Sequence, residues 1–157
     1  MQYKIAIICR NGHIIDRVSE TGYIRKGSKC IQCEAEVISK CESCGEPIRG
    51  DSYCDDPQIF IPKRKKYKPS PVCKKCKKPY PWTVNHIERA DAILKADSRL
   101  STEDKVTFSK CMTQLICGED CYMSMTKKYI GKVDISTKDC LRELITEINT
   151  EAVPKLF

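Results

Sequence analysis

Four closely spaced pairs of potential metal ligands constrain the fold of this 157-residue chain more than any other feature. Three pairs are Cys-x2-Cys motifs, and the fourth is a Cys-x3-His motif. A tetrahedral zinc ion usually takes two such half-sites, so four half-sites suffice for two ions. The predicted ligands are Cys9 and His13, Cys30 and Cys33, Cys41 and Cys44, and Cys73 and Cys76.

The spacing leaves two ways of pairing these half-sites. In a sequential arrangement the first two half-sites bind one Zn²⁺ and the last two bind the other; in a cross-braced arrangement the half-sites alternate. The sequential arrangement is favoured because its shorter loops cost less entropy to close. In either arrangement each ion has four protein ligands and no open position. The two Zn²⁺ ions are therefore expected to be structural cofactors that do not activate water.

The chain has 12 Cys but only three Phe and one Trp, which indicates that metal coordination replaces part of an apolar core. Five Cys lie outside the half-sites and lack their spacing. We interpret them mainly as small buried residues, with a third metal site from the last four as an alternative. They are Cys54, Cys111, Cys117, Cys121 and Cys140.

Residues 1–82 are expected to form a two-zinc ribbon region built of short β-hairpins. The apolar run before Cys9 predicts a strand that enters the first half-site, and HIIDRV predicts the returning strand. EVIS and PIR, on either side of the third half-site, predict further short strands, so the region reads as a chain of small ribbons.

Residues 83–157 are expected to be helical. Thr83 is a candidate N-cap for a first helix, and Ser101 or Thr102 for a second. Further helices are expected at residues 122–130 and from about residue 138, where apolar residues form a stripe that packs within the chain or joins a homo-oligomer. The expected fold class is a small metal-stabilised α+β protein, with tandem zinc ribbons followed by a helical region.

Positive charge is concentrated in one segment. The net charge is +7, yet residues 57–87 contain nine Lys and Arg and no Asp or Glu. Such a segment with aromatic neighbours is typical of nucleic-acid binding, because ammonium groups replace counterions on phosphates and rings stack on unpaired bases. The predicted contacts, with single-stranded RNA favoured, are Lys63, Arg64, Lys65, Lys66, Lys68, Lys74, Lys75, Lys77, Lys78 and Trp82. A solvated loop that offsets thiolate charge, or an acidic protein partner, would also account for these residues.

No segment of the sequence predicts a secretory signal or a membrane span. The opening apolar run is interrupted at Arg10, and charges divide every later window. We therefore expect a cytoplasmic protein with reduced thiols.

Three stretches of the sequence together resemble a bacterial zinc-ribbon family, domain of unknown function 2321. They are YKIAIICRNGHII, CIQCEAEVISKCESCGEPIRG and VCKKCKKPYPWT, and the match extends more loosely to LRELITEINTEA. The resemblance implies the same eight ligands. Family members usually have Gly after the second and fourth half-sites, where this chain has Glu34 and Lys77, and their loop before the last half-site is less basic. By analogy, such proteins suggest a role in bacterial stress or antiviral (phage) defence.

Two hypotheses for function follow. In the first, the protein binds RNA and acts as a ribonuclease, for which His86, Arg49 and Tyr80 are weak catalytic candidates, and an activating protein partner switches it on. In the second, it is a non-enzymatic adaptor or oligomerising scaffold built on zinc ribbons. An acidic turn formed by Asp51, Asp55 and Asp56 could hold a divalent ion, although a solvated turn is the plainer interpretation.

Overall fold

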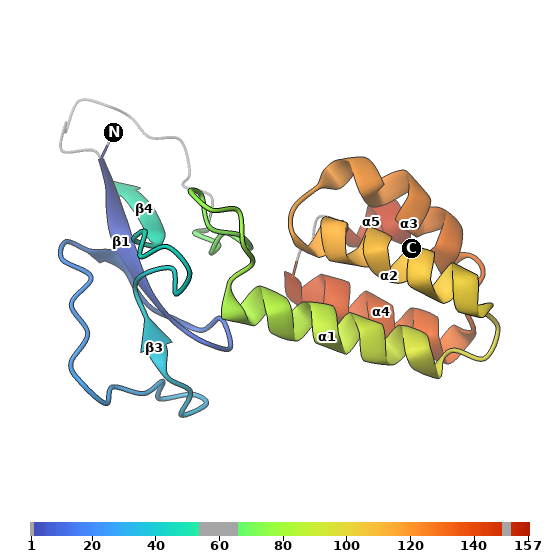
Figure 1. The fold of residues 1–157 in the computed structure, drawn as a ribbon, viewed down its shortest axis with the longest axis horizontal. Coiled ribbons are helices and arrows are strands. Elements are labelled where there is room, and N and C mark those ends of the chain that lie inside the picture. The colour runs from blue at the N-terminus through green and yellow to red at the C-terminus, as the bar shows by residue number, and fades with distance from the viewer. Residues whose placement is uncertain (1, 54–65, 149–151) are drawn as a thin grey trace. The chain divides into compact units, whose positions relative to one another are not determined.

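The computed structural model describes residues 2–53, 66–148 and 152–157 (Figure 1). The chain divides into two compact units, Met1–Trp82 and Thr83–Phe157. The first contains the strands and the predicted half-sites, and the second contains helices, so the chain has the small metal-stabilised α+β fold that the sequence predicts. Within the described ranges, no helix is long and apolar enough to cross a membrane.

A four-stranded antiparallel sheet forms the centre of the first unit. Strand β1, Gln2–Cys9, pairs on one edge with β2, Ile14–Ser19, as the expected hairpin. Its other edge pairs with both β3, Val37–Ile38, and β4, Arg49–Tyr53. The separate ribbons expected from the sequence are thus joined into one sheet, because β1 makes hydrogen bonds along both edges.

Gly50 lets β4 pass close to its neighbours in this sheet. A Cβ atom here would lie 2.3 Å from the carbonyl oxygen of Arg17 and 2.8 Å from that of Lys4. Since no side chain fits in this space, the IRG sequence needs its Gly. The close approach fixes the two preceding residues, placing Ile48 in the core and Arg49 on the surface.

The apolar core of the first unit is small and includes ligand sulfurs. One cluster contains Ala6, Ile8, Cys41, Ile48, Cys73, Tyr80 and Trp82, and the other contains Cys9, Cys30 and Val37. Four of these ten buried residues are predicted metal ligands. Metal coordination therefore supplies cohesion where apolar side chains are few.

Five α-helices and one short 3-10 helix follow in the described part of the chain. Their bounds are α1 Pro81–Ala96, α2 Thr102–Ile116, η1 Asp120–Tyr122, α3 Met123–Ile130, α4 Ile135–Ile148 and α5 Val153–Leu156. In the second unit fourteen buried residues form one core cluster, in which Phe108 and Leu141 are fully buried. This unit has the continuous apolar core that the first unit lacks.

The starts of the helices correct one prediction and confirm another. Thr83 is not the N-cap of α1, because the helix begins at Pro81, whose fixed φ suits a first turn, and Thr83 lies buried within it. Ser101 does cap α2, since its hydroxyl accepts a hydrogen bond of 3.1 Å from the N–H of Asp104.

Two carboxylates connect the loops of the helical unit. Asp97, which is 3% exposed, accepts hydrogen bonds from the N–H groups of Leu100 and Asp134 at 2.8 and 3.0 Å. Asp134 in turn caps α4 by accepting from the N–H of Thr137 at 2.7 Å. Burial alone would raise the pKa of Asp97, but these backbone donors outweigh it and hold the pKa at about 2.

Candidate metal centres

The three Cys-x2-Cys motifs form the same turn. In each, the N–H of the residue after the second Cys donates to the carbonyl of the first Cys, at 2.8 to 2.9 Å. The N–H of the first Cys donates to a carbonyl five residues later, at 2.8 to 2.9 Å. We call these turns knuckles and name them by their residues: 30–34, 41–45 and 73–77. Each knuckle holds its two sulfurs on one side of a closed loop.

Each knuckle places the residue after its second Cys in the left-handed region. Gly45 has φ of 73°, and the equivalent Glu34 and Lys77 have φ of 58° and 61°. Glu34 and Lys77 are the only non-Gly residues with positive φ among those described. The turn therefore forms even where Gly is absent, at a cost of about 1 kcal/mol for each strained residue.

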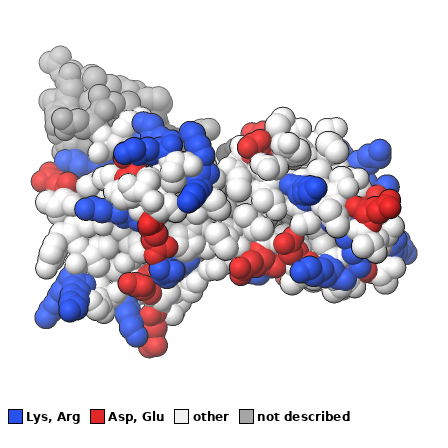
Figure 2. All heavy atoms as spheres, in the orientation of Figure 1, with Lys and Arg blue, Asp and Glu red and all other residues white. Residues whose placement is uncertain are grey.

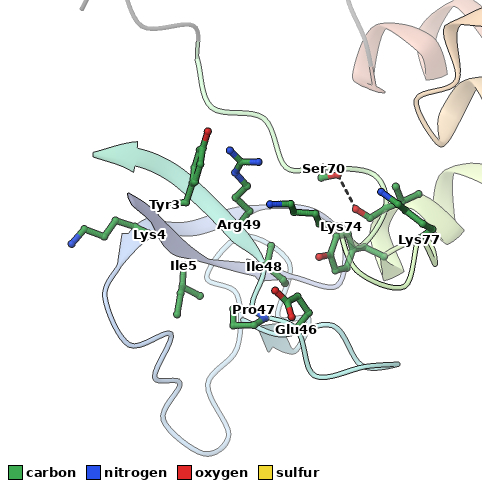
Figure 3. Close-up of a pocket in the computed structure, with 12 residues that line it drawn as sticks. Tyr3, Lys4, Ile5, Glu46, Pro47, Ile48, Arg49, Ser70, Lys74 and Lys77 are labelled. Carbon is green, nitrogen blue, oxygen red and sulfur yellow. Dashed lines mark hydrogen bonds between the residues drawn. The ribbon is translucent and has the colours of Figure 1, made fainter. Parts of the chain in front are cut away.

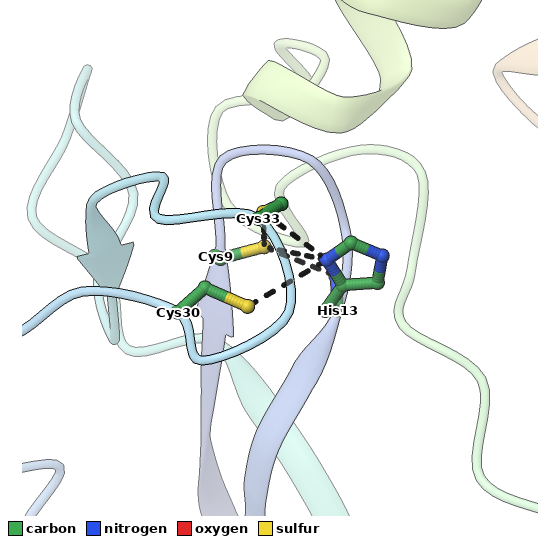
Figure 4. Close-up of side chains that lie close together, drawn as sticks. All are labelled: Cys9, His13, Cys30 and Cys33. Carbon is green, nitrogen blue, oxygen red and sulfur yellow. Dashed lines mark hydrogen bonds between the residues drawn. The ribbon is translucent and has the colours of Figure 1, made fainter.

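The first centre brings together Cys9, His13, Cys30 and Cys33 (Figure 4). His13 Nδ1 faces the three sulfurs, at 3.5 Å from Cys9, 3.6 Å from Cys30 and 3.3 Å from Cys33. The sulfurs of Cys9 and Cys33 are 3.7 Å apart.

The second centre brings together Cys41, Cys44, Cys73 and Cys76. The Cys41 and Cys76 sulfurs lie 3.7 Å apart, and those of Cys44 and Cys73 lie 3.6 Å apart. The half-sites are thus paired sequentially, and the cross-braced alternative is wrong.

These distances fit zinc. With Zn–S of about 2.3 Å and Zn–N of about 2.05 Å, a regular tetrahedron has S–S edges of about 3.8 Å and S–N edges of about 3.6 Å. A disulfide would need S–S of about 2.05 Å, so the sulfurs are spaced as ligands of a common ion. The eight residues therefore provide two structural zinc sites, one with three thiolates and an imidazole and the other with four thiolates. Full protein ligation gives the ions a role in building the fold.

Backbone and amide donors support the sulfurs of the first centre. The N–H of His13 donates to the sulfur of Cys9 at 3.2 Å, and Asn11 Nδ2 donates to that of Cys33 at 3.4 Å. The N–H of Ala35 makes the largest contribution in lowering the pKa of Cys33, to about 6. Such donors favour the thiolate form that binds metal, although at Cys9 burial outweighs them and raises the pKa.

Gly12, in the loop of the first centre, packs against Trp82. Gly12 has φ of 90°, and a Cβ atom there would lie 3.1 Å from Cβ of Trp82. Trp82 is 5% exposed and stacks on Tyr80, with ring centroids 4.6 Å apart. The loop of the first centre therefore packs on the segment that follows the second centre.

The remaining Cys do not gather into a third centre within the part of the chain that the structure describes. Cys111 is buried and Cys117 is half-buried, as expected for small apolar residues, whereas Cys121 and Cys140 are exposed. Cys54 lies outside the described residues, as do Asp55 and Asp56. Asp51, the remaining member of the acidic turn, lies 3.8 Å from Arg17 Nε.

The predicted nucleic-acid contacts are placed unequally. Six of the lysines are exposed, and Figure 2 shows Lys and Arg side chains gathered around the knuckle at 73–77 on the visible face. They are Lys66, Lys68, Lys74, Lys75, Lys77 and Lys78. Trp82, in contrast, is buried and offers no open ring face to a base. Lys63, Arg64 and Lys65 lie outside the described residues.

The three catalytic candidates belong to different units. Arg49 and Tyr80 are in the first, where burial, followed by the charge of the Cys73 sulfur, raises the pKa of Tyr80 far above its usual value. His86 is in the second, where burial lowers its pKa and its Nδ1 atom has no hydrogen-bond partner among the described residues. Tyr80 thus stays neutral at physiological pH, which does not suit a general base.

One family model matches this chain, and it covers residues 2–157. The family is described as "Uncharacterized protein conserved in bacteria (DUF2321)". No curated protein and no solved structure gives a significant match.

Proposed function

Because the chain belongs to the bacterial family DUF2321, whose description names no activity, we propose its function from the site itself: a zinc-ribbon protein that binds nucleic acid, with RNA favoured. The observation that supports the proposal is the exposed lysine group on and beside the knuckle at 73–77. We call this group the basic face; its members are Lys66, Lys68, Lys74, Lys75, Lys77 and Lys78.

The basic face has more positive charge than its surroundings offset. A zinc ion with four thiolates carries a charge of about −2, which six ammonium groups exceed. Among the described residues, one of the six lysines forms an ion pair: Lys75 lies 3.8 Å from Glu46. The surplus is available to phosphates, whose bound counterions the lysines would release.

Burial of the neighbouring aromatic rings changes the expected mode of binding. Tyr80 and Trp82 are 4% and 5% exposed, and Tyr67 is half-buried with its hydroxyl donating to the Arg49 carbonyl at 2.7 Å. Phosphate contacts, rather than stacking on these rings, would therefore provide most of the affinity of the basic face. Each such contact contributes about 0.7 to the slope of log affinity against log salt for a single strand.

Cleavage of the bound RNA, in bacterial stress or antiviral defence in the cytoplasm, is the finer part of the proposal. Arg49 could stabilise a charged phosphorane, and an activating protein partner could complete the site. The experiment is to incubate zinc-loaded protein with labelled single-stranded RNA at low and high salt and to score retention and cleavage separately.

Retention that falls with salt and is lost when Lys74, Lys75, Lys77 and Lys78 are changed to Gln would support RNA binding. Cleavage that His86→Ala abolishes would support an enzyme. RNA retention that changes neither with salt nor with the substitutions would contradict the proposal.

An adaptor or oligomeric scaffold is the second candidate function. Ile135 and Val106 of the helical unit are 75% and 53% exposed and are apolar side chains that such a contact would bury. An adaptor of this kind would bind its partner, or a second copy of the chain, without using the knuckle lysines. The four-lysine variant should then sediment in the same assembly as the wild type.

A further inference from the structure

A cavity of about 400 Å³ lies beside the basic face, within the first unit (Figure 3). Its walls come from β1, from the start of β4 with the residues before it, and from the knuckle at 73–77. Lys74 and Lys77 line the cavity, whereas Lys75 and Lys78 do not. Two of the six lysines of the basic face thus also line the cavity.

The cavity is cationic. Arg49, Lys74 and Lys77 all line it, and none of the three forms an ion pair within the part of the chain that the structure describes. In Figure 3 the side chain of Lys74 extends toward Arg49, while Lys4 points away from both and forms an ion pair with Glu20 at 3.0 Å. Among the described residues, the one carboxylate in the lining is Glu46. An anion that enters the cavity would therefore meet several positive groups.

Arg49 is held in place before any ligand arrives. Its guanidinium lies over the ring of Tyr3, with the carbon Cζ 3.1 Å from the ring centroid. Its carbonyl accepts the hydroxyl of Tyr67, and the close packing at Gly50 fixes the backbone on the other side. A guanidinium that is fixed in this way loses little entropy on binding, and its planar fork matches two oxygens of a phosphate.

The rest of the lining is largely apolar. Ile5 and Val72, which are half-buried, and the exposed Pro47 contribute accessible hydrophobic surface, while the buried Ile48 and Tyr80 lie behind them. The volume lies within the range of small-molecule sites, about 300–1,000 Å³, and exceeds what a phosphate alone requires. A ligand with a phosphate at one end and a ring at the other would use both parts.

We propose that this cavity binds one nucleotide unit of the RNA strand, its phosphate against Arg49 and Lys74 and its base or sugar against the apolar lining. This inference rests on the proposed RNA binding and names the site within it. Lys75 and Lys78, outside the cavity, would contact neighbouring phosphates without selecting a nucleotide.

The test uses the zinc-loaded full chain with four probes: uridine 5′-monophosphate, uridine, inorganic phosphate and a single-stranded oligouridylate. Calorimetry is expected to show the nucleotide binding more tightly than phosphate, and uridine not binding. Arg49→Gln and Lys74→Gln/Lys77→Gln should each weaken nucleotide binding about tenfold, the loss expected for one charged hydrogen bond. The matched control, Lys127→Gln/Lys128→Gln at two exposed lysines of the helical unit, should change it by less than about twofold.

Arg49→Lys keeps the positive charge but loses the planar pair of N–H donors, so it should weaken nucleotide binding by an intermediate factor. Two bound zinc ions per chain in every variant would show that the fold is intact. Nucleotide binding that is equal in wild type and Arg49→Gln, or absent in wild type, would overturn the inference.

The RNA arm separates the two proposals. Retention of the oligouridylate that is unchanged in Arg49→Gln but lost in the four-lysine variant would overturn the cavity and leave RNA binding intact. Nucleotide binding that depends on Arg49, without any RNA retention, would overturn RNA binding and support the cavity as a nucleotide site. A polyglutamate peptide that competes as well as RNA would overturn both in favour of an acidic protein partner.

Discussion

The two units are stabilised by different means. Of ten clustered buried residues in the first unit, four are zinc ligands, whereas the fourteen-residue core of the helical unit contains none. A zinc ion fixes backbone geometry over a few residues, so it can support a knuckle densely covered with lysines that apolar packing could not hold. Zinc coordination and the lysine-rich surface therefore occur in the same unit.

Removal of zinc should have the largest effect, and it should unfold one unit but not the other. Chelation is expected to unfold the first unit, since structural zinc contributes about 10–16 kcal/mol in small domains, while the helical unit keeps its core. Amide NMR signals of β1 should collapse and helical circular dichroism should persist. Cys41→Ser should lower zinc content from two ions to one, and Cys140→Ser, at an exposed position, should leave it at two. Simultaneous loss of both signals would show that the helical unit also depends on zinc for its fold.

The converse change creates a cavity in the helical core. Leu141 is fully buried, and Leu141→Ala should destabilise the helical unit by about 2–5 kcal/mol. Urea unfolding followed by helical circular dichroism measures this, and Ile135→Ala, at an exposed position on the same helix, is the control. Zinc content should stay at two ions; loss of zinc would show that the units depend on each other.

Acid should weaken the helical unit through Asp97. Its pKa is about 2 in the folded state, below the ordinary value of about 3.9, so its stabilising effect is complete above pH 4 and is lost as the pH falls toward 2. Asp97→Asn should cost about 2 kcal/mol at pH 7 because the backbone donors lose a charged acceptor. The cost should shrink below pH 4. A cost that is independent of pH would assign the effect to packing.

The smallest effect is expected at the strained knuckle residues. Glu34→Gly and Lys77→Gly should each stabilise the first unit by about 1 kcal/mol, because Gly adopts positive φ without strain. Gly45→Ala should destabilise it by a similar amount. Gln32→Gly, on the first of these knuckles but without positive φ, is the control, and competition with a zinc chelator is the measurement. Equal effects at residues 32 and 34 would contradict the explanation from φ.

Local spacing predicted the centres well and long-range contacts poorly. The eight ligands and their sequential pairing follow from motifs of a few residues and from short loops. The joining of the ribbons into one sheet does not, because it depends on which edge of β1 meets segments 28 to 51 residues away. The burial of Trp82 was likewise not predicted, although the one Trp of a chain is a natural core residue.

The cavity beside the knuckle at 73–77 likewise depends on long-range contacts. The sheet and the knuckle at 73–77 bring Arg49 and Lys74 together in its lining, and no local sequence pattern predicts that these two residues are close.

The salt dependence of RNA affinity tests the basic face most directly. Zinc-loaded wild type should lose affinity steeply with salt, and Gln at Lys74, Lys75, Lys77 and Lys78 should reduce the slope by about 2.8, or 0.7 for each phosphate contact. The matched variant carries Gln at four exposed lysines of the helical unit, Lys95, Lys110, Lys127 and Lys128, and should keep the wild-type slope. Equal slopes for the two variants would contradict a binding site on the zinc-pinned knuckle.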